Sequence, residues 1–154
     1  VYMRDIHGRT DGPAPHVDLD AEKKNGDFVR GVINDGLATA VHDCSSGGLA
    51  LAVAEMAIAS GIGATIDAVE GHNPVLTFYG EDQGRYVLTV KKTDLDKVQA
   101  SAKAAGVSCA NIGVTGGSAV KLGTARAVEI KELHSAYESW FPQFMDGETL
   151  VAAE

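Results

Sequence analysis

Residues 41–56, with the sequence VHDCSSGGLALAVAEM, carry the side chains best suited to chemistry. The polar and small residues of this stretch are His42, Asp43, Cys44, Ser45, Ser46, Gly47 and Gly48. Two chemistries match these residue types, namely a cysteine nucleophile and a phosphate-binding loop. The structural alternative is a plain turn that caps the following helix.

The cysteine nucleophile is the weaker of the two chemical interpretations. Neighbouring residues of an extended chain point to opposite faces, so Asp43 does not share a face with Cys44. His42 could share that face, but the fold usually brings a catalytic cysteine and histidine together from distant positions. The sequence therefore favours Cys44 as a small buried residue at the end of a strand.

The phosphate-binding loop has a clearer physical basis. A strand that ends in small polar residues and opens a helix can present successive backbone N–H groups, here from residues 45–49. The helix N-terminus adds roughly half a positive charge, and two glycines allow a ligand close to the backbone. The dinucleotide fingerprint and the P-loop pattern are both absent, so the capping turn stays an open alternative.

A second polar cluster lies in the stretch FYGEDQGRY, residues 78–86. Glu81 and Gln83 could face the same way, as could Gln83 and Arg85. A carboxylate, an amide and a guanidinium together can hold a phosphorylated or amide-bearing ligand. The alternative is a solvated turn before an edge strand.

The composition limits the classes of function open to the chain. Its 154 residues suffice for one domain with a buried core. A formal net charge of −8 argues against a nucleic-acid partner, which needs a basic face. Cys44 and Cys109 are far apart and suggest no disulfide framework, so a cytoplasmic location is expected. No stretch is long and apolar enough to predict a membrane span.

Periodicity and turn residues predict an irregular mixture of helices and strands. Helices are expected from Asp18 or Asp20 to 34, and over 48–60, 94–105 and 131–145. Strands are expected over 37–42, 63–68, 85–90, 107–114, 120–122 and 126–130, and residues 74–83 receive no assignment. The last helix should bury a stripe formed by Leu133, Tyr137, Trp140, Phe141 and Phe144. This order favours an α+β fold, a layered α/β/α domain with a small mixed sheet.

Taken together, the motifs resemble the phosphoribosylformylglycinamidine synthase family, also called formylglycinamide ribonucleotide amidotransferase. The stretches AVHDCSSGGLALAVAEMAIASGIGATID, FYGEDQGRYVLTV and HSAYESWFPQFM are similar to its pattern, and so is RTDGPAPHVDLDAEKKNGDFVRGVI. The likeness runs over residues 1–145. One departure is Ser46, which stands where the family usually has aspartate, whereas Cys44 falls at a variable apolar position.

The resemblance implies a domain like the C-terminal domain of aminoimidazole ribonucleotide synthetase. Residues 1–17 would be an arm continuing from a missing domain, residues 18–145 the domain, and residues 146–154 a tail. The family makes formylglycinamidine ribonucleotide from formylglycinamide ribonucleotide, glutamine and ATP, a carbon–nitrogen ligation in purine synthesis. ATP and magnesium are the implied cofactors, and a separate glutaminase subunit and a small bridging subunit are the implied partners.

The resemblance also implies where ligands would lie. Ser45, Ser46, Gly47 and Gly48 would contact phosphate, with His42, Asp43, Glu81, Gln83 and Arg85 around them. Asp43 is a candidate metal ligand, but the catalytic histidine and most magnesium carboxylates belong to other domains of the family. The isolated chain is therefore expected to be inactive. The alternatives are a non-catalytic assembly domain, or the equivalent domain of another ATP-dependent enzyme of this superfamily.

Overall fold

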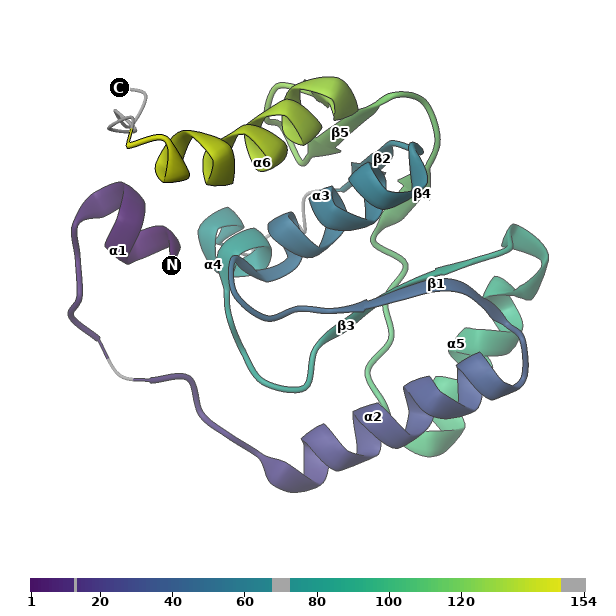
Figure 1. Ribbon diagram of the computed structural model, residues 1–154. Coiled ribbons are helices and arrows are strands. Elements are labelled where there is room, and N and C mark those ends of the chain that lie inside the picture. The colour runs from purple at the N-terminus through teal and green to yellow at the C-terminus, as the bar shows by residue number, and fades with distance from the viewer. Residues whose placement is uncertain (13, 68–72, 148–154) are drawn as a thin grey trace.

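The computed structural model describes residues 1–12, 14–67 and 73–147. These residues form two small β-sheets with helices around them (Figure 1). In the first sheet, β1 (Ala38–Asp43) pairs antiparallel with β3 (Tyr86–Val90). The second sheet has the order β4 (Gly113–Thr115), β2 (Ala64–Ile66), β5 (Ala119–Leu122) and β6 (Val128–Glu129). Strands β2 and β5 are parallel and the other pairs antiparallel, so this sheet is mixed, and the predicted α+β class is confirmed.

Helix α3 (Gly48–Ser60) lies at the centre of the fold. Its buried residues Leu49, Ala52, Val53 and Ala57 pack with core residues from both sheets. The alanines have small side chains, so α3 can approach its neighbours closely. The helix begins and ends where the sequence predicts, because glycines in the left-handed conformation flank it at 47 and 61.

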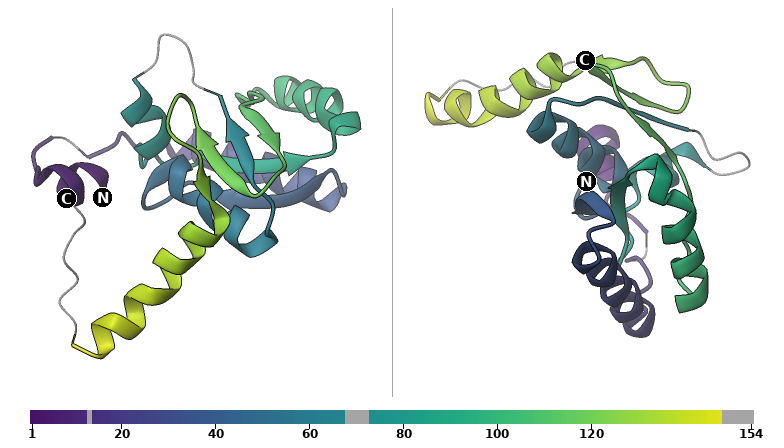
Figure 2. Two further views of the ribbon diagram at one scale, coloured as in Figure 1. Left: turned by 90° about the horizontal axis from the view of Figure 1, so that it is seen from above. Right: turned by 90° about the vertical axis from the view of Figure 1, so that its right-hand side faces the viewer.

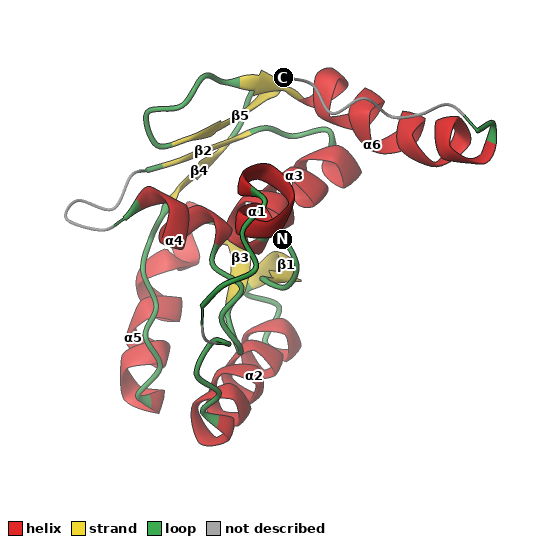
Figure 3. Cartoon of the chain, turned by 90° about the vertical axis from the view of Figure 1, so that its left-hand side faces the viewer, coloured by secondary structure: helices red, strands yellow, loops and turns green. Residues whose placement is uncertain are grey.

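Helices α2 (Leu19–Asn34) and α5 (Leu95–Ala105) cover the opposite side of the β1–β3 ribbon from α3 (Figures 1 and 3). Val32, Leu37 and Val98 form a second apolar cluster there. The Asp18 side chain accepts hydrogen bonds from the backbone N–H groups of residues 20 and 21, which explains why α2 starts at the predicted place. A short 3₁₀ turn, Lys92–Asp94, precedes α5.

Several predicted boundaries need correction. The strand expected over 107–114 is reduced to β4, because β2 offers only three residues for pairing and the Val107 N–H still bonds to the carbonyl of Ala102 in α5. The strand expected over 126–130 is reduced to β6, after which the helix begins. The strand expected over 63–68 is β2, and residue 68 lies outside the described residues.

Two helices occur where the sequence analysis predicts none. Helix α4 (Pro74–Tyr79) occupies the unassigned segment, and the Asn73 side chain caps it by accepting a hydrogen bond from the Val75 N–H. Proline suits the first position of a helix, where its missing N–H costs nothing. Helix α1 (Tyr2–His7) lies within the expected N-terminal arm, and the Tyr2 ring stacks on Tyr79 of α4.

The aromatic stripe of α6 (Ile130–Met145) is exposed, which contradicts the predicted burial. Leu133, near its start, packs partly against the core. The later part of α6 projects beyond the body of the domain (Figure 2), so Tyr137, Trp140, Phe141 and Phe144 are each more than half exposed. Among the described residues, no helix is both long and apolar enough to cross a membrane.

The exposure of α6 predicts how the single tryptophan behaves. Acrylamide should quench Trp140 fluorescence in the folded chain nearly as well as in urea, because the indole is 52% exposed. Trp140→Ala should lower the free energy of unfolding by less than about 1 kcal/mol, the order of one aromatic stacking contact, here with Phe144. Val98→Ala, at a 3% exposed position, should cost about 2 kcal/mol. If acrylamide quenched Trp140 poorly in the folded chain, or if Trp140→Ala cost more unfolding free energy than Val98→Ala, α6 would have to pack against the domain.

Candidate functional site

The pairing of β1 with β3 brings the two polar clusters of the sequence together. In this ladder Asp43, the last residue of β1, lies opposite Tyr86, the first residue of β3. The loop after β1 therefore meets the segment before β3, and the Cys44 N–H donates to the carbonyl of Arg85 over 2.8 Å. The candidate site is the loop 44–47 with the N-terminus of α3, next to the segment 80–85.

Besides the Cys44 N–H, two more backbone N–H groups of the candidate site have partners within the chain, one in the loop and one at the start of α3. The Gly47 N–H donates to Glu81 Oε1 over 2.7 Å, and the Gly48 N–H donates to the carbonyl of Ser45 over 3.0 Å. The Gly47 hydrogen bond is the main reason why the pKa of Glu81 lies below the ordinary value of a glutamate. Ser45 and Ser46 are exposed.

Protein atoms fill the space beside Gly48. A β-carbon built there would lie 2.5 Å from the carbonyl oxygen of Gly80 and 2.9 Å from that of Phe78. Gly48 also has a φ of +64°, a conformation that other residues adopt only with strain. Glycine at this position thus lets α3 pack against the end of α4, whereas the sequence pattern alone suggested that it allows a ligand to approach.

Arg85 faces the end of α4. Its guanidinium donates to the backbone carbonyls of Thr77 and Gly80, each over 3.2 Å, and to Asp82 Oδ2 over 3.1 Å. A cation at the C-terminus of a helix is stabilised by the carbonyl groups that the helix leaves without partners. Arg85 therefore fixes the segment before β3. Gln83 and Asp82 are exposed on this segment.

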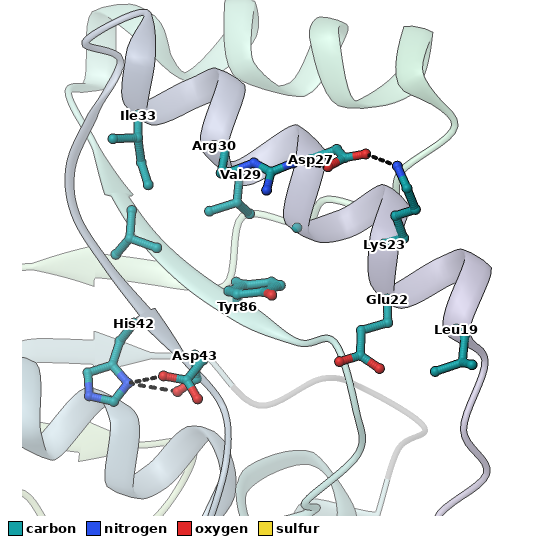
Figure 4. Close-up of a pocket in the computed structure, with 12 residues that line it drawn as sticks. Leu19, Glu22, Lys23, Asp27, Val29, Arg30, Ile33, His42, Asp43 and Tyr86 are labelled. Carbon is teal, nitrogen blue, oxygen red and sulfur yellow. Dashed lines mark hydrogen bonds and ion pairs between the residues drawn. The ribbon is translucent and has the colours of Figure 1, made fainter.

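His42 and Asp43 contact each other, with His42 Nδ1 3.7 Å from Asp43 Oδ1 (Figure 4). The His42 ring lies against α3, with Nε2 3.1 Å from Glu55 Oε2 and Nδ1 2.7 Å from the carbonyl oxygen of Asp43. The Asp43 side chain is exposed and lines the groove beside α2 (Figure 4). Sequence reasoning missed the Glu55 contact, although Glu55 is the one charged residue within α3, which could have drawn attention to it.

Cys44 has the surroundings of a core residue. It is 7% exposed, and burial raises the pKa of its thiol. A thiol in an apolar environment is a poor nucleophile, because the reactive thiolate is disfavoured. The structural interpretation of Cys44 is the one that its geometry supports.

A groove of about 770 Å³ runs between α2 and the β1–β3 ribbon (Figure 4). It is lined by Leu19, Glu22, Lys23, Gly26, Asp27, Val29, Arg30, Ile33, Val41, His42, Asp43 and Tyr86. Within this lining, Lys23 and Arg30 both pair with Asp27, and Tyr86 lies opposite apolar side chains of α2 such as Val29 (Figure 4). The groove adjoins the candidate site, because Asp43 lies on its wall and precedes the loop directly.

The described residues do not form a magnesium site by themselves. No group of three or more His, Cys, Asp or Glu side chains suited to a metal ion occurs within residues 1–12, 14–67 and 73–147. Asp43 is a single exposed carboxylate. Magnesium commonly takes one or two protein carboxylates together with substrate phosphates, so Asp43 is at most one ligand of a site completed by other groups.

The fold and sequence together define the class of protein. The chain belongs to the family of AIR synthase related proteins, C-terminal domain, whose pattern matches residues 2–123. It is 88% identical over 154 residues to phosphoribosylformylglycinamidine synthase subunit PurL of Agrobacterium fabrum. It is 71% identical over 148 residues to the PurL subunit of Rhizobium meliloti. The chain spans about a fifth of the length of these curated relatives, 20% in both cases.

Solved structures share the fold. PurL of Thermotoga maritima complexed with FGAR has a TM-score of 0.70 and 16% identity, over 83% of this chain and 23% of that one. The same protein complexed with ATP also has a TM-score of 0.70, over 80% of this chain and 23% of that one. The resemblance seen in the sequence is therefore confirmed at the level of family and fold.

The packing of Gly48 predicts a specific loss of stability. Gly48→Ala and Gly61→Ala both place a side chain at positive φ, +64° and +69°, at opposite ends of α3. Each should cost about 1–2 kcal/mol for that conformation. A β-carbon built at Gly61 would meet no described atom within 4 Å beyond its own helix and chain neighbours, so only Gly48→Ala should lose about 1–3 kcal/mol more from overlap with α4. If urea denaturation shows the same loss of unfolding free energy for Gly48→Ala and Gly61→Ala, the Gly80 carbonyl can move aside to make room for the new side chain.

The two thiols should differ in reactivity. Iodoacetamide should modify Cys44 more slowly than the partly exposed Cys109, and both more slowly than in urea, because burial raises the pKa of each thiol. Peptide mapping by mass spectrometry near neutral pH measures the two rates. If iodoacetamide modified Cys44 as fast in the folded chain as in urea, the thiol would be accessible and reactive, and the nucleophile interpretation would be supported again.

Proposed function

We propose that this chain acts as the C-terminal-type domain of a phosphoribosylformylglycinamidine synthase. The observation that carries the proposal is the 88% identity to a PurL subunit over all 154 residues. The complete enzyme would convert formylglycinamide ribonucleotide, glutamine and ATP to formylglycinamidine ribonucleotide in purine synthesis. Such a reaction is a carbon–nitrogen ligation with glutamine as the amide donor.

The contribution of this domain would be contacts to a ligand phosphate. Ser45 and Ser46 are exposed at the N-terminus of a helix of 13 residues, where an anion is stabilised by N–H groups and the helix dipole. Ser46, which stands where the family usually has aspartate, keeps a hydroxyl that can donate to phosphate. Asp43 and Gln83 are the other candidate ligand residues with exposed side chains. Structures of Thermotoga maritima PurL complexed with FGAR, ATP and ADP support ligands of this class.

The chemistry itself would come from elsewhere in the complete enzyme. We assign no catalytic residue to this chain, because His42 lies against Glu55 and Cys44 is buried. Magnesium would be held mainly by other domains, and Asp43 would supply one ligand. A separate glutaminase subunit would supply ammonia, a small subunit would bridge the two proteins, and the assembly would work in the cytoplasm.

The proposed ligand role can be tested with the isotope-labelled chain. Titration with Mg-ADP, and separately with formylglycinamide ribonucleotide, should shift the backbone amide resonances of residues 45–49 saturably. The double variant Ser45→Ala/Ser46→Ala should bind about tenfold or more weakly, since each hydroxyl can hydrogen-bond to a charged group.

Ser60→Ala is the matched control, because Ser60 lies at the other end of α3 and its hydroxyl bonds to the carbonyl of Met56. Its affinity should equal that of the unchanged chain. Absence of saturable shifts at residues 45–49, or equal affinity in the double variant, would contradict the ligand role and favour an assembly domain.

A further inference from the structure

The segment 80–85 is bonded to the candidate ligand loop at several points. Glu81 accepts the Gly47 N–H, the Arg85 carbonyl accepts the Cys44 N–H, and the Gly80 carbonyl packs against Gly48. Three residues of the segment thus contact the loop or the start of α3. The Arg85 side chain in turn bonds to the carbonyl of Gly80, which fixes the segment from the other side.

We infer that Glu81 is a positioning residue. Its carboxylate accepts the Gly47 N–H, which holds the candidate ligand loop, residues 44–47, in place. The carboxylate also occupies the position at the start of α3 where a bound anion would otherwise lie. The inference deepens the proposed function and rests on it in one respect, namely that the loop receives phosphate. Glu81 would then act on ligand binding through the loop and not by touching the ligand. Sequence reasoning had placed Glu81 among the ligand contacts.

The charge and position of Glu81 support this role. Its carboxylate lies 2.7 Å from the Gly47 nitrogen, at the end of α3 where the helix dipole favours negative charge. The side chain is 33% exposed. The cations that face it are the Val1 ammonium, 3.2 Å from Oε2, and Arg4 of α1. On its own segment, Asp82 and Arg85 pair with each other.

A consequence follows for any anionic ligand at this loop. One N–H group forms one strong hydrogen bond, so a phosphate oxygen and the Glu81 carboxylate compete for the Gly47 N–H. The two like charges also repel each other across the loop. An anionic ligand therefore has two ways to bind. It can bond to the other N–H groups while the Gly47 N–H stays bonded to Glu81, or it can displace the Glu81 carboxylate, which lowers its affinity.

Amide hydrogen exchange tests the positioning role without any ligand. Glu81→Ala should speed exchange of the Gly47 N–H by about tenfold to a hundredfold, the effect expected from losing a hydrogen bond to a charged group. Glu81→Gln keeps a neutral acceptor and should give a smaller increase. Asp82→Asn is the matched control, because Asp82 is the adjacent carboxylate and bonds to Arg85. It should change Gly47 exchange by less than about twofold.

Unchanged Gly47 exchange in Glu81→Ala, with the remaining amides of α3 still protected, would overturn the inference. Equal acceleration in Asp82→Asn would overturn it as well, because the effect would then belong to the segment as a whole. The remaining N–H groups of α3 report whether a variant has lost its fold.

Titration with inorganic phosphate tests the competition. Glu81→Gln should bind phosphate roughly threefold or more tightly than the unchanged chain, because a like charge near the loop is removed. Asp82→Asn should show little change. Weaker phosphate binding in Glu81→Gln, with Gly47 exchange nearly unchanged, would overturn the inference, since Glu81 would then assist the ligand directly and not through the loop. If no variant binds phosphate while Gly47 exchange responds as expected, the proposed phosphate loop fails and the positioning role stands.

Discussion

The close contact between Gly48 and the backbone of residues 78–80 is the constraint on which the rest of the structure depends. It fixes the N-terminus of α3 against the end of α4, and α3 is the element around which both sheets pack. Only glycine satisfies both the positive φ and the short distance to the Gly80 carbonyl. The loop after β1 is therefore held by backbone packing at Gly48 together with the hydrogen bond from the Gly47 N–H to the Glu81 side chain.

The polar groups at this junction fall into two sets. One set forms hydrogen bonds within the chain that hold the junction together, and the other set is exposed and could contact a ligand. Arg85 and Glu81 are partly buried and bond to backbone atoms of α4 and of the loop. Ser45, Ser46 and Gln83 are exposed. Since a group engaged in an internal hydrogen bond must lose it before binding a ligand, the exposed residues are the better candidates for contact. The sequence placed all of these residues at one site but could not distinguish the two roles.

The parts of the fold that were predictable are those with local signals. The ends of α3 follow from glycines at 47 and 61, and the start of α2 follows from the capping side chain of Asp18. The bond from Gly47 to Glu81 joins residues 34 positions apart and depends on how β1 pairs with β3, which no local pattern specifies. The long strand expected over 107–114 failed for a related reason, because a strand extends only as far as its partner. The apolar face of α6 has helical periodicity, but periodicity does not reveal whether another surface covers that face.

The arrangement of reactive groups bears on how much chemistry this chain could perform alone. The Cys44 thiol is buried with a raised pKa, and the His42 ring is placed between Glu55 and the Asp43 carbonyl. Phosphoryl transfer from ATP needs cations or metal ions to stabilise developing negative charge. The described residues around the loop include the carboxylates of Glu81 and Asp43, and the nearby cations Arg85 and Arg4 pair with Asp82 and Asp5, within a chain of net charge −8. Under the proposed function, the loop would orient an anionic ligand, and the positive charge that the reaction requires would come from other parts of the complete enzyme.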